Sequence, residues 1–140
     1  MQEPVFRLTY CSHSALDCAA DPTELDRILA TSRRNNAAAG VTGALIYNRG
    51  IFAQTLEGSF DAVQTVFERI QSDLRHDEIV VLQAEPVEER LFGAWAMAQA
   101  EPDHPARVHE TLTSAMIDPG VTAAPPLLEL LTRVVRHAPA

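Results

Sequence analysis

Four polar side chains that form directional hydrogen bonds fall at positions where the sequence pattern predicts burial: Tyr10, Ser32, Asn36 and Gln54. A buried amide or hydroxyl costs free energy unless it is hydrogen-bonded, so each of the four needs a partner. Any one alone could be satisfied by other side chains or by buried water. As a set from three separate segments, they could equally bind a polar, planar ligand, and periodicity does not identify that ligand.

Two predicted strands place Tyr10 and Gln54 among apolar side chains. Residues alternate in character from Val5 to Ser12, and Tyr10 falls on the face that carries the apolar residues two and four positions before it. In the strand predicted from Ile51 to Glu57, the residues two positions before and after Gln54 are apolar as well. Both polar side chains should therefore point into an apolar layer.

A helix should supply the remaining polar groups. We expect it to begin with Asp21 as the N-cap and Pro22 at the first helical position, and to run to about Asn36. At 100° per residue, Ser32 and Asn36 fall at the centre of its apolar stripe, and Asn35 lies on the flank. The helix must then pack over the strands that carry the phenol and the glutamine.

The other patterns complete a βαββαββ order. Asn48-Arg49-Gly50 is typical of a hairpin turn, and a second amphipathic helix follows the hairpin. The order predicts an α+β, ferredoxin-like sandwich in which two helices cover one face of a mixed, five-stranded sheet. The remaining elements are expected at Val41–Asn48, Phe60–Leu74, Ile79–Gln83 and Leu91–Met97.

The last part of the chain is expected to be a helical extension, residues 100–140, that follows a first domain, residues 1–99. One amphipathic stripe runs from Val108 to Met116. A second helix, in the run LLELLTRVVRH, is apolar around most of its circumference and must be covered. The cover is either the sheet face that the first two helices leave bare or the same surface on a second copy.

Composition and charge exclude several classes of protein. The net charge of -8, from 11 Lys+Arg and 19 Asp+Glu, opposes binding to nucleic acid or to an anionic membrane surface. No apolar run is long enough to span a bilayer, and the start lacks a signal-peptide pattern, which predicts a cytoplasmic protein with Cys11 and Cys18 reduced. No histidine spacing indicates a metal site.

Five stretches of the sequence match one family together, in order and spacing: RLTYCS, SRRNNAAAGVTGALIY, IFAQTLEG, DLRH and ERLFGAWAM. On these stretches the chain, from about Val5 to Gln99, resembles the BLUF family of flavin-binding blue-light sensors, in its short stand-alone form. The resemblance implies FAD held between the first two helices, above the sheet.

The resemblance also implies a role for each matching position. Tyr10 would be the photochemical electron and proton donor, and Gln54 the amide that bridges it to the flavin ring. Trp95 and Met97 would couple the flavin to the output surface, and their spacing does not decide which of the two faces the ring. The flavin-binding residues would be Tyr10, Ile28, Ser32, Asn35, Asn36, Leu45, Phe52, Gln54, Ile70, Arg75, His76 and Met97.

The expected function is a blue-light photoreceptor and not an enzyme. Light would drive electron and proton transfer from Tyr10 and rearrange the hydrogen bonds of Gln54, giving a red-shifted state that reverts in the dark. A homodimer acting on a separate effector protein is expected. The alternative is a cofactor-free, ferredoxin-like interaction module with a structural polar set; a flavoenzyme would need a nucleophile-base pair or a GxGxxG fingerprint, and neither is visible.

Overall fold

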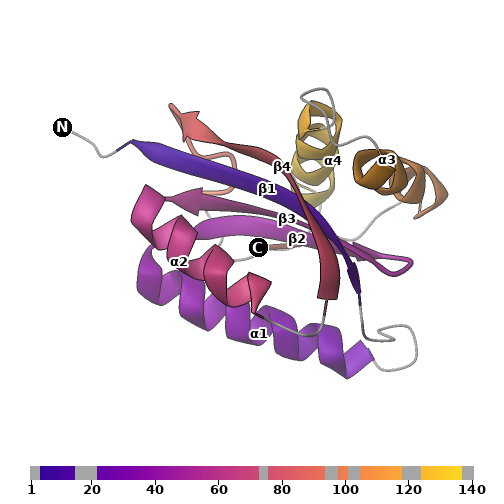
Figure 1. Cartoon of the computed structure of the whole chain (residues 1–140), viewed down its shortest axis with the longest axis horizontal. Helices are drawn as coiled ribbons and strands as arrows, with labels where there is room; N and C mark the ends of the chain where they lie inside the picture. The colour runs from indigo at the N-terminus through magenta and orange to yellow at the C-terminus, as the bar shows by residue number, and fades with distance from the viewer. Residues whose placement is uncertain are drawn as a thin grey trace.

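The structure is a computed structural model, and it places most of the chain around one sheet. Five strands are hydrogen-bonded in the order β4-β1-β3-β2-β5 (Figure 1). β1, β3 and β2 pair antiparallel, as do β1 and β4, whereas β5 runs parallel to β2. The strands are β1 (Val5–Ser14), β2 (Thr42–Asn48), β3 (Ile51–Gly58), β4 (His76–Val87) and β5 (Ala98–Ala100). The described residues are 4–14, 22–72, 76–93, 98–100, 105–117 and 124–136.

Two helices lie on each face of the sheet (Figure 1). On one face are α1 (Pro22–Ala39) and α2 (Phe60–Gln71), and on the other are α3 (Pro105–Ile117) and α4 (Ala124–Arg136). The predicted α+β class is therefore confirmed. None of the helices in the described part of the chain is long and apolar enough to cross a membrane.

The alternation of side chains along β3 divides the interior into two cores. Phe52 and Leu56 pack in the core under α1 and α2. Ile51 and Ala53 point the other way and pack with buried residues of α3 and α4. Every residue of β3 is buried, because helices cover both of its faces. The apolar helix α4 is thus covered by the sheet of its own chain.

Several element boundaries differ from those that periodicity predicts. α1 continues to Ala39, and α2 ends at Gln71. β4 is twelve residues long and pairs with β1 along its whole length. Its position at the edge of the sheet tolerates Pro86 and many polar side chains, which hid the strand pattern.

The strand predicted for Leu91–Met97 is wrong in its first part. Residues 91–93 form bends and a turn, residues 94–97 lie outside the described part of the chain, and β5 begins only at Ala98. The physical reason is visible in the hydrogen bonds. The backbone N–H groups of Leu91 and Phe92 donate to the side chain of Glu57 and not to a neighbouring strand.

Cys11 is buried and free in the core beneath α3 and α4. Burial raises the pKa of its thiol to about 12, so the thiol stays protonated near neutral pH. Cys18 lies outside the described residues.

Gly43 marks a close approach between β2 and β3. A Cβ atom at this position would lie 1.9 Å from the carbonyl oxygen of Thr55, which belongs to the backbone and cannot move aside. Gly43→Ala should therefore lower the free energy of unfolding by about 2–4 kcal/mol, measured by urea denaturation. Gly93→Ala is the control, since its Cβ would meet Arg90 Cβ at an ordinary 3.5 Å. Equal urea midpoints for the two variants would contradict this account.

Candidate functional site

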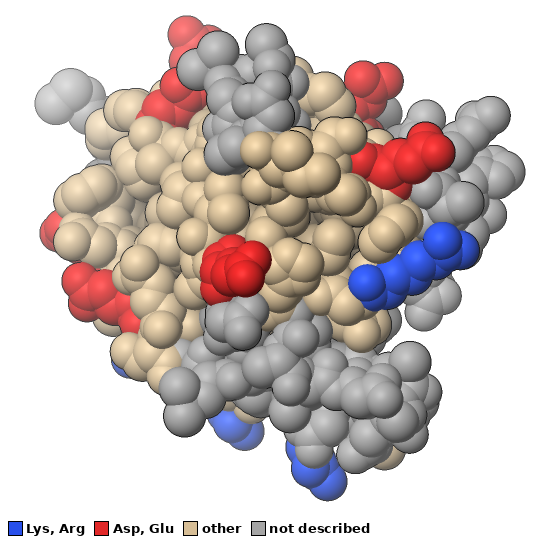
Figure 2. Space-filling model, turned by 45° about the vertical axis from the view of Figure 1, so that its right-hand side comes forward, with Lys and Arg blue, Asp and Glu red and all other residues tan. Residues whose placement is uncertain are grey.

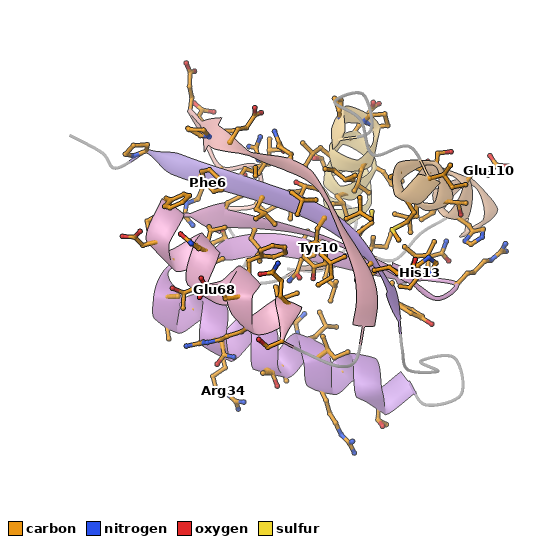
Figure 3. All side chains as sticks on the ribbon, viewed as in Figure 1. Phe6, Tyr10, His13, Arg34, Glu68 and Glu110 are labelled. Carbon is orange, nitrogen blue, oxygen red and sulfur yellow. The ribbon has the colours of Figure 1, made fainter. Side chains whose placement is uncertain are left out.

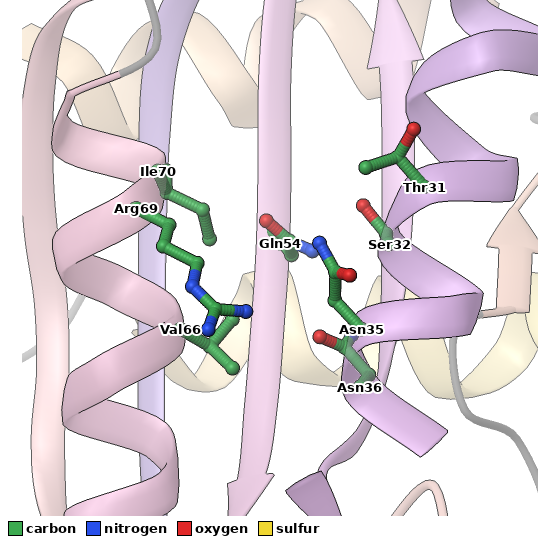
Figure 4. A pocket seen from close by; sticks show the side chains of 8 residues that line it. All are labelled: Thr31, Ser32, Asn35, Asn36, Gln54, Val66, Arg69 and Ile70. Atoms are coloured by element: carbon green, nitrogen blue, oxygen red, sulfur yellow. The ribbon is translucent and has the colours of Figure 1, made fainter. Parts of the chain in front are cut away.

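A pocket opens between α1 and α2, above the middle of β3 (Figure 4). One wall is polar and comes mainly from α1, whereas α2 contributes both apolar side chains and a guanidinium group. Gln54 forms the floor. The lining residues are Thr31, Ser32, Asn35, Asn36, Gln54, Val66, Arg69 and Ile70.

Tyr10 and Gln54 contact each other directly beneath this pocket. They are paired across β1 and β3, which places both side chains on the same face of the sheet. The Tyr10 hydroxyl donates a hydrogen bond to Oε1 of Gln54. Both residues are buried, with exposures of 3% and 4%, and the Tyr10 ring packs against Phe67 at a centroid distance of 5.6 Å. The phenol is therefore held in one position with its hydroxyl on the amide.

The orientation of Gln54 follows from that hydrogen bond. Its carbonyl end is occupied by Tyr10, and its amide nitrogen lies on the side of α1, toward the Asn35 and Asn36 side chains (Figure 4). The glutamine thus has one end on a phenol and the other toward the polar wall of the pocket. Such a group can report a change on one side to the other, because its two ends have opposite hydrogen-bonding character.

α1 delivers the polar residues predicted for its buried stripe. Asn36 is 1% exposed, and Ser32 and Asn35 are half-buried. The helix ends just beyond them, where the N–H of Val41 donates to the Asn36 carbonyl at 2.9 Å. This end fixes the position of the asparagines relative to β2.

Other predicted flavin contacts lie near the pocket or outside the described chain. Ile70 lines the pocket, while Ile28, Leu45 and Phe52 belong to the same hydrophobic core as Tyr10. Their contact with a flavin stays a prediction. Arg75, Trp95 and Met97 lie outside the described residues, and of His76 only the backbone, at the start of β4, is described.

Three lining residues were not predicted: Thr31, Val66 and Arg69. The helical spacing of α2 contained a signal for two of them, because Val66, Arg69 and Ile70 fall at i, i+3 and i+4 and share one face. The sequence pattern assigned no role to Arg69. The structure instead has Arg69 on the pocket wall (Figure 4).

Acidic side chains at the surface are the other candidates for a binding site, in this case for a metal ion. In the view of Figure 2, the visible acidic side chains lie at several separate places on the surface and form no single patch. In the described part of the chain, no group of three or more His, Cys, Asp or Glu residues is arranged to hold a metal ion.

A comparison with known families identifies the class of protein that this fold and pocket belong to. Residues 5–98 match the family model of BLUF, described as sensors of blue-light using FAD. The chain therefore belongs to the BLUF family, as the sequence motifs predicted.

The relatives and solved structures differ in how much of their own length this chain covers. The photoactivated adenylate cyclase subunit beta of Euglena longa is 36% identical over 94 residues, which are 66% of this chain and 11% of that protein. Among structures, the BLUF protein BlrB in its dark state has a TM-score of 0.70 and 30% identity, covering 96% of this chain and 97% of its own. BlsA in its photo-activated state has a TM-score of 0.74 and 25% identity, covering 97% and 98%. This chain thus spans about a tenth of the cyclase subunits but nearly the whole of BlrB and BlsA.

Proposed function

We propose that this protein records blue light as a change in the hydrogen bonds of Gln54 beside a flavin bound between α1 and α2. The observation that carries the proposal is the buried contact between the Tyr10 hydroxyl and Oε1 of Gln54 at the floor of the pocket. A phenol in hydrogen-bond contact with an amide is the pair needed to move a proton and then reverse a hydrogen-bond pattern.

The residues of the pocket suit FAD as the ligand. A flavin ring has an edge of carbonyl and N–H groups and two flat, apolar faces. The amides of Asn35 and Asn36 supply both donors and acceptors for such an edge, while Val66 and Ile70 offer aliphatic contact to a face. The guanidinium of Arg69 supplies donors for a carbonyl or phosphate oxygen.

Bound FAD supplies a strong oxidant when it absorbs blue light. Tyr10 would release an electron and its phenolic proton toward the ring and later regain both, so that no net oxidation occurs. Gln54 would rotate or tautomerise during this exchange and present its opposite end to the ring. The stable change is then one of hydrogen bonds alone, which should appear as a small red shift of the absorption band and a weaker C4 carbonyl stretch.

Reconstitution with FAD followed by blue light tests the proposal. We expect a flavin spectrum that shifts to the red on illumination and recovers in darkness. A protein that takes up no flavin would instead support the cofactor-free interaction module. Bleaching of the flavin by added NADH, with turnover, would support an enzyme.

We further propose that the signal leaves through residues 100–140 to a separate cytoplasmic effector, with the chain acting as a homodimer and having no enzymatic activity of its own. The support is that α3 and α4 pack directly on the far side of the sheet that carries Tyr10 and Gln54. A further support is that the chain is similar to part of a photoactivated adenylate cyclase subunit, in which the matching region is joined to an effector.

Arg69 gives a prediction about affinity for the cofactor. Arg69→Ala removes the donors that the pocket wall offers to flavin oxygens, and we expect the Kd for FAD to rise about three- to tenfold. Titration of apoprotein by flavin fluorescence would measure this. Arg34→Ala is the control, because Arg34 extends from α1 away from the pocket (Figure 3). Equal affinities in the two variants would exclude Arg69 from the site.

A further inference from the structure

Glu57 is a fully buried acidic residue on the face of β3 opposite to Gln54. It lies three residues after Gln54, so strand alternation points its side chain toward the face of α3 and α4. Its side chain is 0% exposed and accepts a hydrogen bond from Arg7 Nε at 2.8 Å. Arg7 is its neighbour across β1, so the ion pair crosses two adjacent strands in one row.

Both members of this ion pair also hold the segment that follows β4. Glu57 Oε2 accepts the N–H of Leu91 at 2.9 Å, and Oε1 accepts the N–H of Phe92 at 2.8 Å. Arg7 Nη2 donates to the carbonyl of Glu89 at 3.0 Å. One carboxylate therefore accepts three hydrogen bonds, two of them from backbone that is part of no strand.

Arg90 ties the same segment to the third strand of the row. Its Nη1 donates to Thr42 Oγ1 at 2.9 Å and to the backbone carbonyl of Glu57 at 3.3 Å. Thr42 is the partner of Glu57 across β2. Residues 89–92 thus lie across β1, β3 and β2 at one level of the sheet, and Phe92 inserts at 1% exposure into the core beneath α3 and α4.

A buried ion pair adds little net stability, because apolar residues of similar volume usually stabilise a core as well. What apolar residues cannot replace is the set of directional bonds that a carboxylate accepts from backbone N–H groups. The arrangement therefore points to a positional role for Glu57, and a contribution to stability does not explain it.

We propose that Glu57 is a positioning residue that fixes residues 89–92 to the strand bearing Gln54. A rearrangement at Gln54 on the pocket face then reaches this segment on the opposite face through three residues of one strand. Energetic coupling between two places can be carried by a chain of packed and hydrogen-bonded residues, and β3 with its carboxylate supplies such a chain. The inference rests on the proposed function for its light-dependent part, whereas the attachment itself can be tested in darkness.

Glu57→Gln is the sharpest variant, because it changes the charge and hardly changes the size. Glutamine has one acceptor oxygen where the carboxylate has two, so it cannot accept from Arg7, Leu91 and Phe92 together. At least one of these donors must then face the amide NH2 group. Glu88→Gln is the matched control, since it makes the same change at an exposed side chain in the same segment.

The first measurement is amide hydrogen exchange at Leu91 and Phe92 by NMR, in darkness. We expect exchange in Glu57→Gln to be roughly tenfold faster or more, and unchanged in Glu88→Gln. If Glu57→Gln does not fold, Arg7→Met combined with Glu57→Met removes both charges together and should remain folded, with the same faster exchange. If Leu91 and Phe92 exchange at the wild-type rate in the variant that folds, Glu57 does not hold residues 89–92 to β3.

The second measurement compares the same amides before and after blue light. We expect a light-dependent change in exchange in the wild type and in Glu88→Gln, and its loss in Glu57→Gln while the red-shifted flavin band persists. A red shift with no change at these amides in the wild type, or a change that survives in Glu57→Gln, overturns the coupling. A wild type without any red shift refutes the proposed photoreceptor function instead, and leaves the dark measurement to decide the attachment.

Discussion

Tyr10→Phe should bind flavin as the wild type does and give no red-shifted state under blue light. The substitution removes only the hydroxyl, which donates to Gln54 Oε1 and is the group that would supply the electron and the proton. The ring and its packing against Phe67 remain. We expect the amplitude of the light-induced shift to fall to zero, and the free energy of unfolding to fall by only about 1 kcal/mol. Absorption difference spectra and urea denaturation measure the two effects.

Tyr47→Phe is the control for the loss of a phenol from the same core. Tyr47 packs beside Phe52 in the core under α1 and α2 but does not line the pocket. This variant should keep the full light-induced shift. A normal photocycle in Tyr10→Phe, or an equal loss of the shift in both variants, would refute the assignment of Tyr10 as the donor.

Gln54→Leu should also retain flavin and abolish the red shift, for a different reason. The leucine fills the space of the amide but has no donor or acceptor, so nothing remains to reverse a hydrogen-bond pattern. The buried Tyr10 hydroxyl loses its acceptor at Oε1, which should lower the free energy of unfolding by about 1–3 kcal/mol. The C4 carbonyl stretch of the flavin should be the same before and after illumination, as measured by infrared difference spectroscopy.

Gln64→Leu makes the same substitution on the exposed side of α2. It should change stability by no more than about 0.5 kcal/mol and keep the photocycle. A shift that persists in Gln54→Leu would exclude the amide as the switch, even if Tyr10 proves to be the donor.

Sequence periodicity placed correctly those residues that lie in a strand or helix with regularly spaced apolar side chains. Tyr10 and Gln54 each sit in a strand with apolar residues two positions away, and Ser32 and Asn36 sit in a helix with a clear stripe. Side-chain direction in such elements follows from backbone geometry alone. The sequence alone could therefore predict that these four side chains face the layer between the sheet and α1.

The elements that sequence periodicity misplaced are those decided by distant contacts. Leu91 and Phe92 have the composition of a strand, but a carboxylate from β3 takes their N–H groups. β4 extends over polar residues because β1 offers a partner along its whole length. Arg69 was missed because its helical spacing with Val66 and Ile70 shows a shared face but does not by itself indicate a pocket. Each outcome depends on residues far away in sequence, which a local pattern does not contain.

The cover that α4 gives to the sheet also constrains how a partner can bind. Leu127 and Leu131 of α4 are fully buried together with Ile46 of β2. Any protein that binds this face of the sheet must displace a helix that is tethered to it, and a tethered helix competes at a high effective concentration. The helix therefore acts as a built-in competitor, and binding there would become strong only in a state that weakens its packing.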